Sequence, residues 1–342
     1  MPRSTRAPLV LLLALASAGL LATGCGEDDP GGSASSSAPA AAGSFPVVVE
    51  HTYGSTEITA PPKRIVTVGL TEQDALLALG VVPVATSDWI GLPGGIGPWA
   101  EDELGDKPRP VLLDTSDGIQ FERVAAQRPD LIIALYAGLT KDEYEKLSRI
   151  APTVAQPAEY NEWGIPWQEA TVTIGRILGR EADAQAVVAQ VDERFAAERA
   201  AHPEFAGQTA AMATPYEGYY VYGPDDPRTR MLADLGFTIP DGLDEIAGSS
   251  FGGNISRERL DLLDVGAMVW LANPADAAKI RADPLYRNLT VGREGRDVFI
   301  GEESPINDPA SFVTALSLPY LLDTLVPMLA AAADGDPATR VE

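Results

Sequence analysis

Short apolar runs alternate with helical patterns in the first half of the chain. The β-branched run at 64–69 predicts a strand, and the apolar spacing at 72–79 predicts a helix that ends at Gly80. The next strand is expected at 81–85. Further strands are predicted at 111–113, 131–135 and 153–155, with helices at 121–127 and 141–150. This spacing implies parallel strands, and α/β sheets of this kind bind ligands at their carboxyl edge.

A long helical segment separates this half from a second α/β series. Residues 181–201 carry apolar side chains at helical spacing with no Gly or Pro. About 20 residues in a helix reach roughly 30 Å, which is long enough to join two lobes. After Pro203 the predicted strands are 209–213, 219–222, 267–271 and 298–300, and the predicted helices are 229–235 and 316–333. We expect an α/β fold of two Rossmann-like lobes joined by one long helix, with a ligand cleft between them.

The two halves share a repeated unit. In segments 119–133 and 255–269 a Glu followed by Arg precedes a short helix, a turn and an apolar strand. The glutamates are Glu122 and Glu258. Internal duplication explains this similarity most simply, and chance likeness of two common helix-to-strand units is the alternative.

The first 25 residues have the pattern of a secretion signal. Arg3 and Arg6 precede an apolar stretch at 9–21 that is short for a membrane span, and small residues precede Cys25. The sequence Leu-Ala-Thr-Gly-Cys resembles a lipoprotein signal-peptidase site, although Ala22 stands where many such sites have Leu. The alternative is an ordinary signal peptide with an incidental Cys. The predicted organisation is a lipoprotein signal peptide at 1–25, a disordered tether at 26–44, an N-terminal α/β lobe at 45–180, a linking helix at 181–202, a C-terminal α/β lobe at 203–333 and a tail at 334–342.

Composition and charge narrow the possible partners. The 342 residues include 25 Lys plus Arg against 49 Asp plus Glu, a formal charge of −24 that becomes −26 once the leader with Arg3 and Arg6 is removed. Such an acidic chain is not expected to bind nucleic acid. One Cys allows no internal disulfide, and the two histidines, His51 and His202, are too few for a three-histidine metal site.

Five segments carry a resemblance to a known family. They are Pro62-Lys-Arg-Ile-Val-Thr-Val-Gly69, Asp74-Ala-Leu-Leu-Ala-Leu-Gly80-Val-Val-Pro-Val84, Arg128-Pro-Asp-Leu-Ile-Ile133, Leu147-Ser-Arg-Ile-Ala-Pro-Thr-Val154 and Ile174-Gly-Arg-Ile-Leu-Gly179. Together with the leader, the tether and the linking helix, their order resembles the iron-siderophore substrate-binding lipoproteins of ABC importers, in particular the actinobacterial type with one rigid interlobe helix. The resemblance covers about residues 45 to 331.

The resemblance implies a function without catalysis or cofactor. It implies a monomer held at the outer face of the cell membrane by a lipid on Cys25, which captures a ferric siderophore in the interlobe cleft and delivers it to the permease subunits. Glu122 and Glu258 match the positions that dock onto the permease. Glutamate is also favoured in the first turn of a helix for its charge alone, which is the structural alternative.

Aromatic and cationic residues in the predicted loops are the ligand candidates. Rings stack on aryl groups, and Arg donates several hydrogen bonds to an anionic chelate. The candidates are Trp89, Trp99, Tyr136, Trp163, Tyr222, Arg228, Arg230, Ser250 and Phe251. Core packing is the alternative for the rings, and pairing with Asp225 or Asp226 is the alternative for the two arginines.

Other functions remain open on the sequence. Haem is one, because a tyrosinate at Tyr136 or Tyr222 is able to ligate ferric iron, and cobalamin is another that suits this fold. An exported hydrolase is disfavoured because the chain has no Gly-x-Ser-x-Gly motif and no Gly-rich phosphate loop with Lys. A structural envelope protein is the remaining class, and it predicts no tightly bound small ligand.

Overall fold

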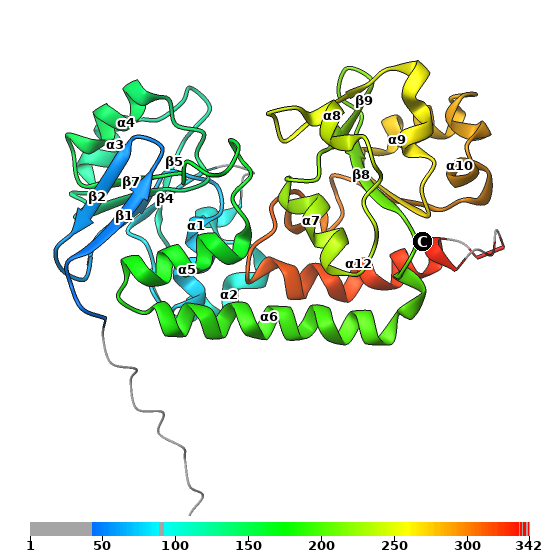
Figure 1. Ribbon diagram of the computed structural model, residues 1–342. Coiled ribbons are helices and arrows are strands. Elements are labelled where there is room, and N and C mark those ends of the chain that lie inside the picture. The colour runs from blue at the N-terminus through cyan, green and yellow to red at the C-terminus, as the bar shows by residue number, and fades with distance from the viewer. Residues whose placement is uncertain (1–42, 89–91, 335, 337, 340, 342) are drawn as a thin grey trace, which may run out of the picture. The chain divides into compact units, whose positions relative to one another are not determined.

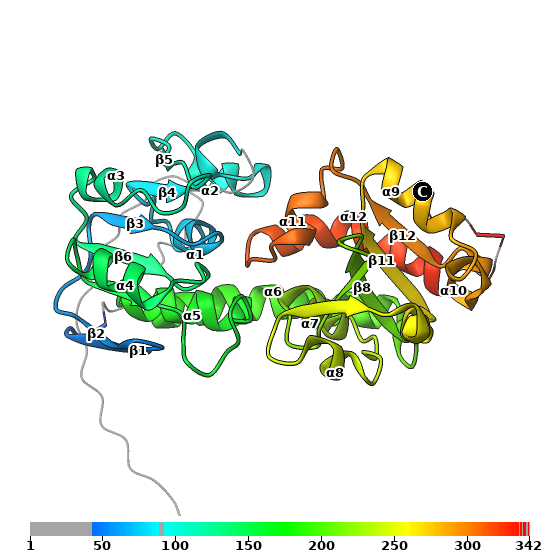
Figure 2. The ribbon, with the colours of Figure 1, turned by 90° about the horizontal axis from the view of Figure 1, so that it is seen from above.

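Two five-stranded sheets organise the computed structural model, which describes residues 43–88, 92–334, 336, 338–339 and 341. The strand order is β5-β4-β3-β6-β7 in the N-terminal lobe and β10-β9-β8-β11-β12 in the C-terminal lobe (Figures 1 and 2). The first sheet comprises β3 (Ile65–Thr67), β4 (Ala85–Ser87), β5 (Val111–Leu113), β6 (Leu131–Ala134) and β7 (Thr153–Ala155). The second comprises β8 (Ala210–Thr214), β9 (Tyr219–Tyr222), β10 (Gly252–Ile255), β11 (Ala267–Leu271) and β12 (Asp297–Ile300). Each sheet puts its first strand at the centre, so the predicted α/β fold is confirmed.

The two sheets differ in strand direction. All strand pairs of the first sheet are parallel, whereas β9 runs antiparallel to both β8 and β10. Strands β8, β11 and β12 are parallel to one another. A hairpin that the sequence did not predict, β1 (Val47–His51) and β2 (Gly54–Ile58), also packs in the N-terminal lobe. The two lobes therefore share the order of their strands but differ in the direction of some strand pairs.

Helices connect and cover the strands. In the N-terminal lobe they are α1 (Glu72–Ala78), η1 (Pro93–Gly95), η2 (Pro98–Ala100), α2 (Glu101–Leu104), α3 (Phe121–Ala126), α4 (Lys141–Ser148) and α5 (Trp167–Ile177), where η marks a 3₁₀ helix. In the C-terminal lobe they are η3 (Pro203–Phe205), α7 (Pro227–Asp234), α8 (Leu243–Ala247), η4 (Arg257–Leu263), α9 (Pro274–Ala282), η5 (Tyr286–Asn288), α10 (Thr290–Glu294), α11 (Asn307–Ser311) and α12 (Ser317–Ala333). Among the described residues, no helix combines the length and apolar character that crossing a membrane requires.

The linking helix α6 spans Glu181–Ala201, as the apolar spacing predicted. Ala184 near its start is buried in the core of the N-terminal lobe. Val191 and Phe195, two and three turns further on, are buried in the core of the C-terminal lobe. The helix is the long green element in Figure 1. One continuous helix thus contributes side chains to both cores.

The strand expected at 81–85 was placed too early. Gly80 has φ +72°, and the Val81 N–H donates to the Leu76 carbonyl at 2.9 Å, so the chain is still closing helix α1 at this point. Strand pairing begins only at Ala85, which aligns with Val66 of β3. Apolar character alone did not distinguish the turn that leads into the strand from the strand itself.

The repeated unit occupies equivalent places in the two lobes. The segment with Glu122 forms α3 and leads into β6, and the segment with Glu258 forms η4 and leads into β11. Both β6 and β11 are fourth in the order of their sheets. The second helix is 3₁₀ where the first is α-helical. This correspondence favours duplication over chance likeness.

The lobes exchange large side chains across their boundary. Trp167, the first residue of α5, is buried in the core of the C-terminal lobe, and Phe312, which follows α11, packs against the core of the N-terminal lobe. The hollow between them, which Tyr136 and Pro227 also line, measures only about 20 Å³. This seam is therefore closed, and the ligand cleft that we expected between the lobes is not open at this point.

A buried carboxylate joins the lobes next to the same seam. Asp74 of α1 accepts a hydrogen bond from Thr314 Oγ1 at 2.6 Å and another from Trp99 Nε1 at 2.7 Å, both at Oδ2. Its Oδ1 atom is buried without a hydrogen-bond partner. Burial raises the pKa of Asp74 to about 6. The two hydrogen bonds act in the opposite direction and lower this pKa, and the negative charge of Glu103 raises it further.

Asp74 should make the stability of the protein depend on pH. Its raised pKa means that the folded state holds a proton that the unfolded chain releases near pH 4, so stability falls as the pH rises through about 6. The variant Asp74→Asn lacks this penalty. We expect the free energy of unfolding of the wild type, relative to Asp74→Asn, to decrease by about 3 kcal/mol between pH 4 and pH 7 in urea titrations. Thr314→Val should enlarge the decrease, and a flat difference would contradict the assignment.

Candidate functional site

Tyr136 anchors the N-terminal side of the candidate site. It lies two residues beyond β6, and its backbone N–H donates to Glu72 Oε1 at 2.9 Å. Burial raises the pKa of Glu72. A Cβ on Gly69 would lie 2.0 Å from Glu72 Oε1, so the glutamate reaches the loop only because residue 69 is a glycine. Two elements that are distant in sequence thereby fix the position of Tyr136.

Trp163 packs edge-on against Tyr136, with ring centroids 5.0 Å apart. Its backbone has φ +66°, a left-handed conformation that bulky residues seldom adopt. The indole also covers Gly138, where an added Cβ would come within 2.6 Å of Trp163 Cζ2. Such strain persists where the surrounding structure enforces it, and it is common at ligand sites.

Tyr222, Arg228 and Asp226 form the C-terminal side of the site. The guanidinium of Arg228 stacks over the Tyr222 ring, with Cζ 3.8 Å from the ring centroid. Its Nε and Nη2 atoms donate to the two oxygens of Asp226 at 2.7 and 2.6 Å. Arg228 is 8% exposed and Asp226 is fully buried. Burial alone lowers the pKa of Arg228, but the charge and hydrogen bonds of Asp226 outweigh it and the net pKa is raised.

The two sides meet at the seam. Burial raises the pKa of the Tyr136 hydroxyl, and the charges of Arg228 and Asp226 across the boundary act on it as well. Arg230 crosses the boundary directly, because its Nη1 donates to the Gly164 carbonyl at 2.6 Å. The structure thus brings Tyr136, Trp163, Tyr222 and Arg228 into one connected group, with Arg230 beside it. We call Tyr136, Trp163, Tyr222, Asp226 and Arg228 the seam cluster.

A row of rings continues from the seam cluster to the surface. Phe251 lies 5.9 Å from the Arg228 guanidinium, and Tyr220 lies 5.6 Å from Phe251. Tyr216, 62% exposed, meets Tyr220 edge-on at 6.3 Å. Ser250 is exposed and hydrogen bonds to Tyr220. We call Tyr220, Phe251, Tyr216 and the adjacent Ser250 the outer ring row. It offers the accessible surface that the buried members of the seam cluster lack.

Sequence reasoning did not select Tyr216 or Tyr220 for the site, although a signal was present. Residues 220 and 222 share one face of β9, whereas Tyr219 faces Trp270 and Tyr286 in the core on the other side of the sheet. Strand alternation groups Tyr220 with Tyr222 for this reason. Ser250 and Phe251, which were selected, lie beside both.

Two of the expected tryptophans do not join this group. Trp89 lies outside the described residues. Trp99 lines a separate groove of about 770 Å³ between η2, α6 and α12, where its ring lies 6.2 Å from Tyr320. This groove shares no lining residue with the small hollow at the seam. We therefore leave Trp99 out of the site proposed below.

Both arginines have the acidic partners that were the alternative to ligand binding. Arg228 pairs with Asp226, as described, and Arg230 Nη2 lies 3.3 Å from Asp225. The first pair is buried, whereas Asp225 is 67% exposed through its side chain. Both arginines lie near the site, and each pairs with an aspartate. Ligand binding and pairing with an aspartate, the two alternatives from the sequence, therefore do not exclude each other.

Glu122 and Glu258 are exposed on opposite halves of the chain, each as the second residue of its helix. His51 and His202 also lie in different elements, β1 and the end of α6. His51 Nε2 pairs with Thr56 Oγ1 at 3.0 Å, and His202 Nδ1 pairs with Glu204 at 2.9 Å. The histidines therefore have separate local partners.

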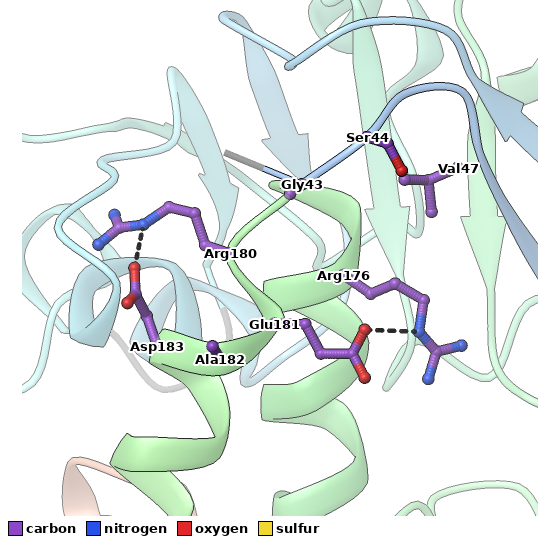
Figure 3. Close-up of a pocket in the computed structure, with 9 residues that line it drawn as sticks. Gly43, Ser44, Val47, Arg176, Arg180, Glu181, Ala182 and Asp183 are labelled. Carbon is purple, nitrogen blue, oxygen red and sulfur yellow. Dashed lines mark hydrogen bonds and ion pairs between the residues drawn. The ribbon is translucent and has the colours of Figure 1, made fainter. Parts of the chain in front are cut away.

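Another hollow, of about 280 Å³, lies where the described chain begins (Figure 3). It is lined by Gly43, Ser44 and the turn between α5 and α6. Its two arginines are engaged: Arg180 Nε lies 2.7 Å from Asp183, and Arg176 Nε lies 4.0 Å from Glu181. The Gly43 N–H donates to the Gly179 carbonyl at 2.7 Å. This hollow shares no lining residue with the seam cluster.

Comparison with known proteins gives this arrangement a context. Residues 65–303 match the family model described as periplasmic binding protein. The chain belongs to this family. The match runs from β3 of the first sheet to the segment beyond β12 of the second, and so includes both sides of the seam.

Three relatives of this periplasmic binding protein are informative. The ferric-anguibactin-binding protein FatB of Vibrio anguillarum is 26% identical, over 82% of this chain and 87% of FatB. A periplasmic solute-binding protein of Mycobacterium smegmatis has a crystal structure with 35% identity and a TM-score of 0.73, covering 84% of this chain and 99% of that one. Streptococcus pneumoniae PiaA in complex with ferrichrome has 26% identity and a TM-score of 0.77, covering 85% and 99%.

Proposed function

We propose that this protein is the extracytoplasmic solute-binding component of an ABC importer and that its ligand is a ferric siderophore. The observation that carries the proposal is the convergence of aromatic and arginine side chains from both lobes at the seam, in a member of the periplasmic binding protein family. FatB binds ferric anguibactin and PiaA was crystallised with ferrichrome, which supports an iron chelate as the ligand. The role is binding and delivery, not catalysis.

We propose that the chelate binds beside the closed seam and not within it. A hollow of about 20 Å³ does not admit a ferric siderophore. The outer ring row and Trp163 are partly or well exposed and lie next to the buried members of the seam cluster. The chelate therefore rests against these rings, with the Arg228 guanidinium beneath them.

Haem is less well supported than a siderophore. Axial ligation by tyrosine requires a phenolate, and burial raises the pKa of both Tyr136 and Tyr222. Both rings are also packed among buried neighbours, at 7% and 6% exposure. Neither phenol is poised to ionise or accessible to a macrocycle. No observation favours cobalamin.

The membrane attachment rests on the sequence. Cys25 is the only cysteine of the chain and follows the leader and its small residues. We place the lipid on this residue, and the Gly-, Ser-, Ala- and Pro-rich segment after it acts as a tether. Delivery to the permease then requires only diffusion at the membrane surface.

Ferric siderophore binding should quench the intrinsic tryptophan fluorescence of the purified full chain, because Trp163 lies at the proposed site. Removing two rings in Tyr220→Ala/Phe251→Ala should weaken binding at least about 10-fold, given about 0.5–1.5 kcal/mol for each aromatic contact beyond its area. The control is Tyr320→Ala, in the separate groove with Trp99. Absence of binding to any of a chemically diverse set of ferric siderophores would refute the proposed function.

Permease docking predicts a loss of uptake without a loss of binding. In Glu122→Arg/Glu258→Arg the two exposed carboxylates become cations that repel permease arginines, so siderophore uptake should fall at least about 10-fold while the ligand Kd is unchanged. The matched control is Glu145→Arg/Glu303→Arg, which makes the same charge change at exposed positions of both lobes. Equal uptake by the two double variants would rule out the docking role.

Lipid attachment predicts that Cys25→Ala is lost from the membrane fraction. Acyl chains contribute about 0.8 kcal/mol per buried CH₂, and no thiol remains to carry them. Ser36→Ala, a change in the same segment, should leave the protein on the membrane. Immunoblots of membrane and soluble fractions measure the distribution. If Cys25→Ala stays membrane-bound after its leader is removed, Cys25 is not the anchor.

A further inference from the structure

The two arginines of the site do not present free positive charge. Arg228 forms two hydrogen bonds with Asp226 through Nε and Nη2, at 2.7 and 2.6 Å. Arg230 donates two hydrogen bonds, from Nη1 to the Gly164 carbonyl at 2.6 Å and from Nη2 to Asp225 Oδ1 at 3.3 Å. Each cation is matched by an aspartate, so the four side chains together carry no net formal charge.

Asp226 is not free to leave Arg228 when a ligand arrives. Its Oδ1 atom also accepts the backbone N–H of Arg228 at 2.8 Å, which makes Asp226 the N-cap of α7. Loss of such a cap destabilises the helix. Asp226 is 0% exposed, and separating it from Arg228 would leave a buried charge uncompensated. A ligand therefore meets the ion pair intact.

The loop that carries Trp163 is acidic. The carboxylate of Glu162 lies over Gly138, where an added Cβ would be 2.5 Å from Oε1. Glu159 and Glu169 act on Tyr160 in the loop that carries Trp163. The whole chain has a formal charge of −24. The described surroundings of the ring row thus give an anionic ligand no net attraction.

One polar group of Arg228 is not engaged by Asp226. Among the described residues the side-chain hydrogen bonds of Arg228 come from Nε and Nη2, and Nη1 makes none, on a side chain that is 8% exposed. A guanidinium N–H whose charge is already matched is a good donor to an uncharged or weakly charged oxygen acceptor. The rings of Tyr220, Phe251 and Trp163 supply apolar surface around this donor.

We infer that this protein selects an electroneutral ferric chelate of the tris-hydroxamate class over an anionic tris-catecholate or carboxylate chelate. The inference rests on the proposed function and concerns the same site. Three singly charged hydroxamates balance the charge of ferric iron, whereas three doubly charged catecholates leave a trianion. Placing that trianion on a site without net positive charge incurs a desolvation cost that nothing offsets.

Binding of two probes to the purified full chain tests the selectivity. Ferrichrome is the neutral tris-hydroxamate and ferric enterobactin is the anionic tris-catecholate. We expect a Kd for ferrichrome at least about 100-fold lower than that for ferric enterobactin, and a ferrichrome Kd that changes less than about 2-fold between low and high salt, because a neutral ligand is not screened. Equal or tighter binding of ferric enterobactin would overturn the inference but leave the proposed function standing. Binding of neither probe nor any other ferric siderophore would refute both.

The variant Asp226→Asn tests the cause. Asn keeps an N-cap acceptor for α7 but removes the charge that matches Arg228. We expect the ratio of its Kd for ferric enterobactin to its Kd for ferrichrome to fall at least about 10-fold relative to the wild type. Asp225→Asn is the matched control on the adjacent, exposed pair, and its effect should be smaller. Thermal unfolding establishes that both variants are folded, and the salt dependence of the wild type provides an independent measurement. An unchanged preference in folded Asp226→Asn would show that the ion pair does not set selectivity.

Discussion

The exchange of Trp167 and Phe312 across the boundary between the lobes is the constraint on which the rest of the site depends. Each side chain completes the hydrophobic core of the opposite lobe, and the Asp74–Thr314 hydrogen bond joins the lobes beside them. Burying a large aromatic side chain is worth several kcal/mol, and opening the seam would expose both rings. These contacts hold the lobes together, and helix α6, which contributes to both cores, adds to them.

This constraint explains why the site is a surface of rings next to a closed seam. The seam between the lobes is closed, so the accessible rings are those at the edge of the boundary. Buried residues support the cluster: Glu72 holds the loop of Tyr136, and Tyr222 stacks beneath Arg228. A support that is already ordered reduces the entropy lost when ligand binds.

The pairing of the arginines changes the electrostatic interpretation of the sequence. An acidic chain with two arginines near a predicted cleft suggested local cations for an anionic ligand. Asp226 and Asp225 lie three positions or fewer upstream of Arg228 in the same turn, and the start of α7 folds each aspartate onto an arginine. Because the Asp226 pair is buried and also caps the helix, its neutrality is part of the fold and does not depend on the ligand.

Much of the architecture follows from sequence periodicity, which reflects local forces. The linking helix and the strands at 111–113, 153–155, 219–222 and 267–271 have the predicted bounds. The strand at 81–85 was misplaced because apolar residues that close a helix look like residues that begin a strand. The antiparallel β9 was not predicted, because strand direction depends on which partners meet and not on the strand's own residues.

For the candidate site, the sequence determined which residue types are available, and the tertiary structure determined which of them meet. Tyr136, Trp163, Tyr222, Arg228 and Phe251 could be proposed from their positions in predicted loops and strand ends. Three features of the site depend on contacts and burial. Trp99 packs near Tyr320 and not in the seam cluster, Tyr220 packs against Phe251, and Asp226 neutralises Arg228. These features depend on packing between elements that are distant in sequence, or on the dielectric around a pair of charges. The linear sequence pattern predicts neither the packing nor the dielectric.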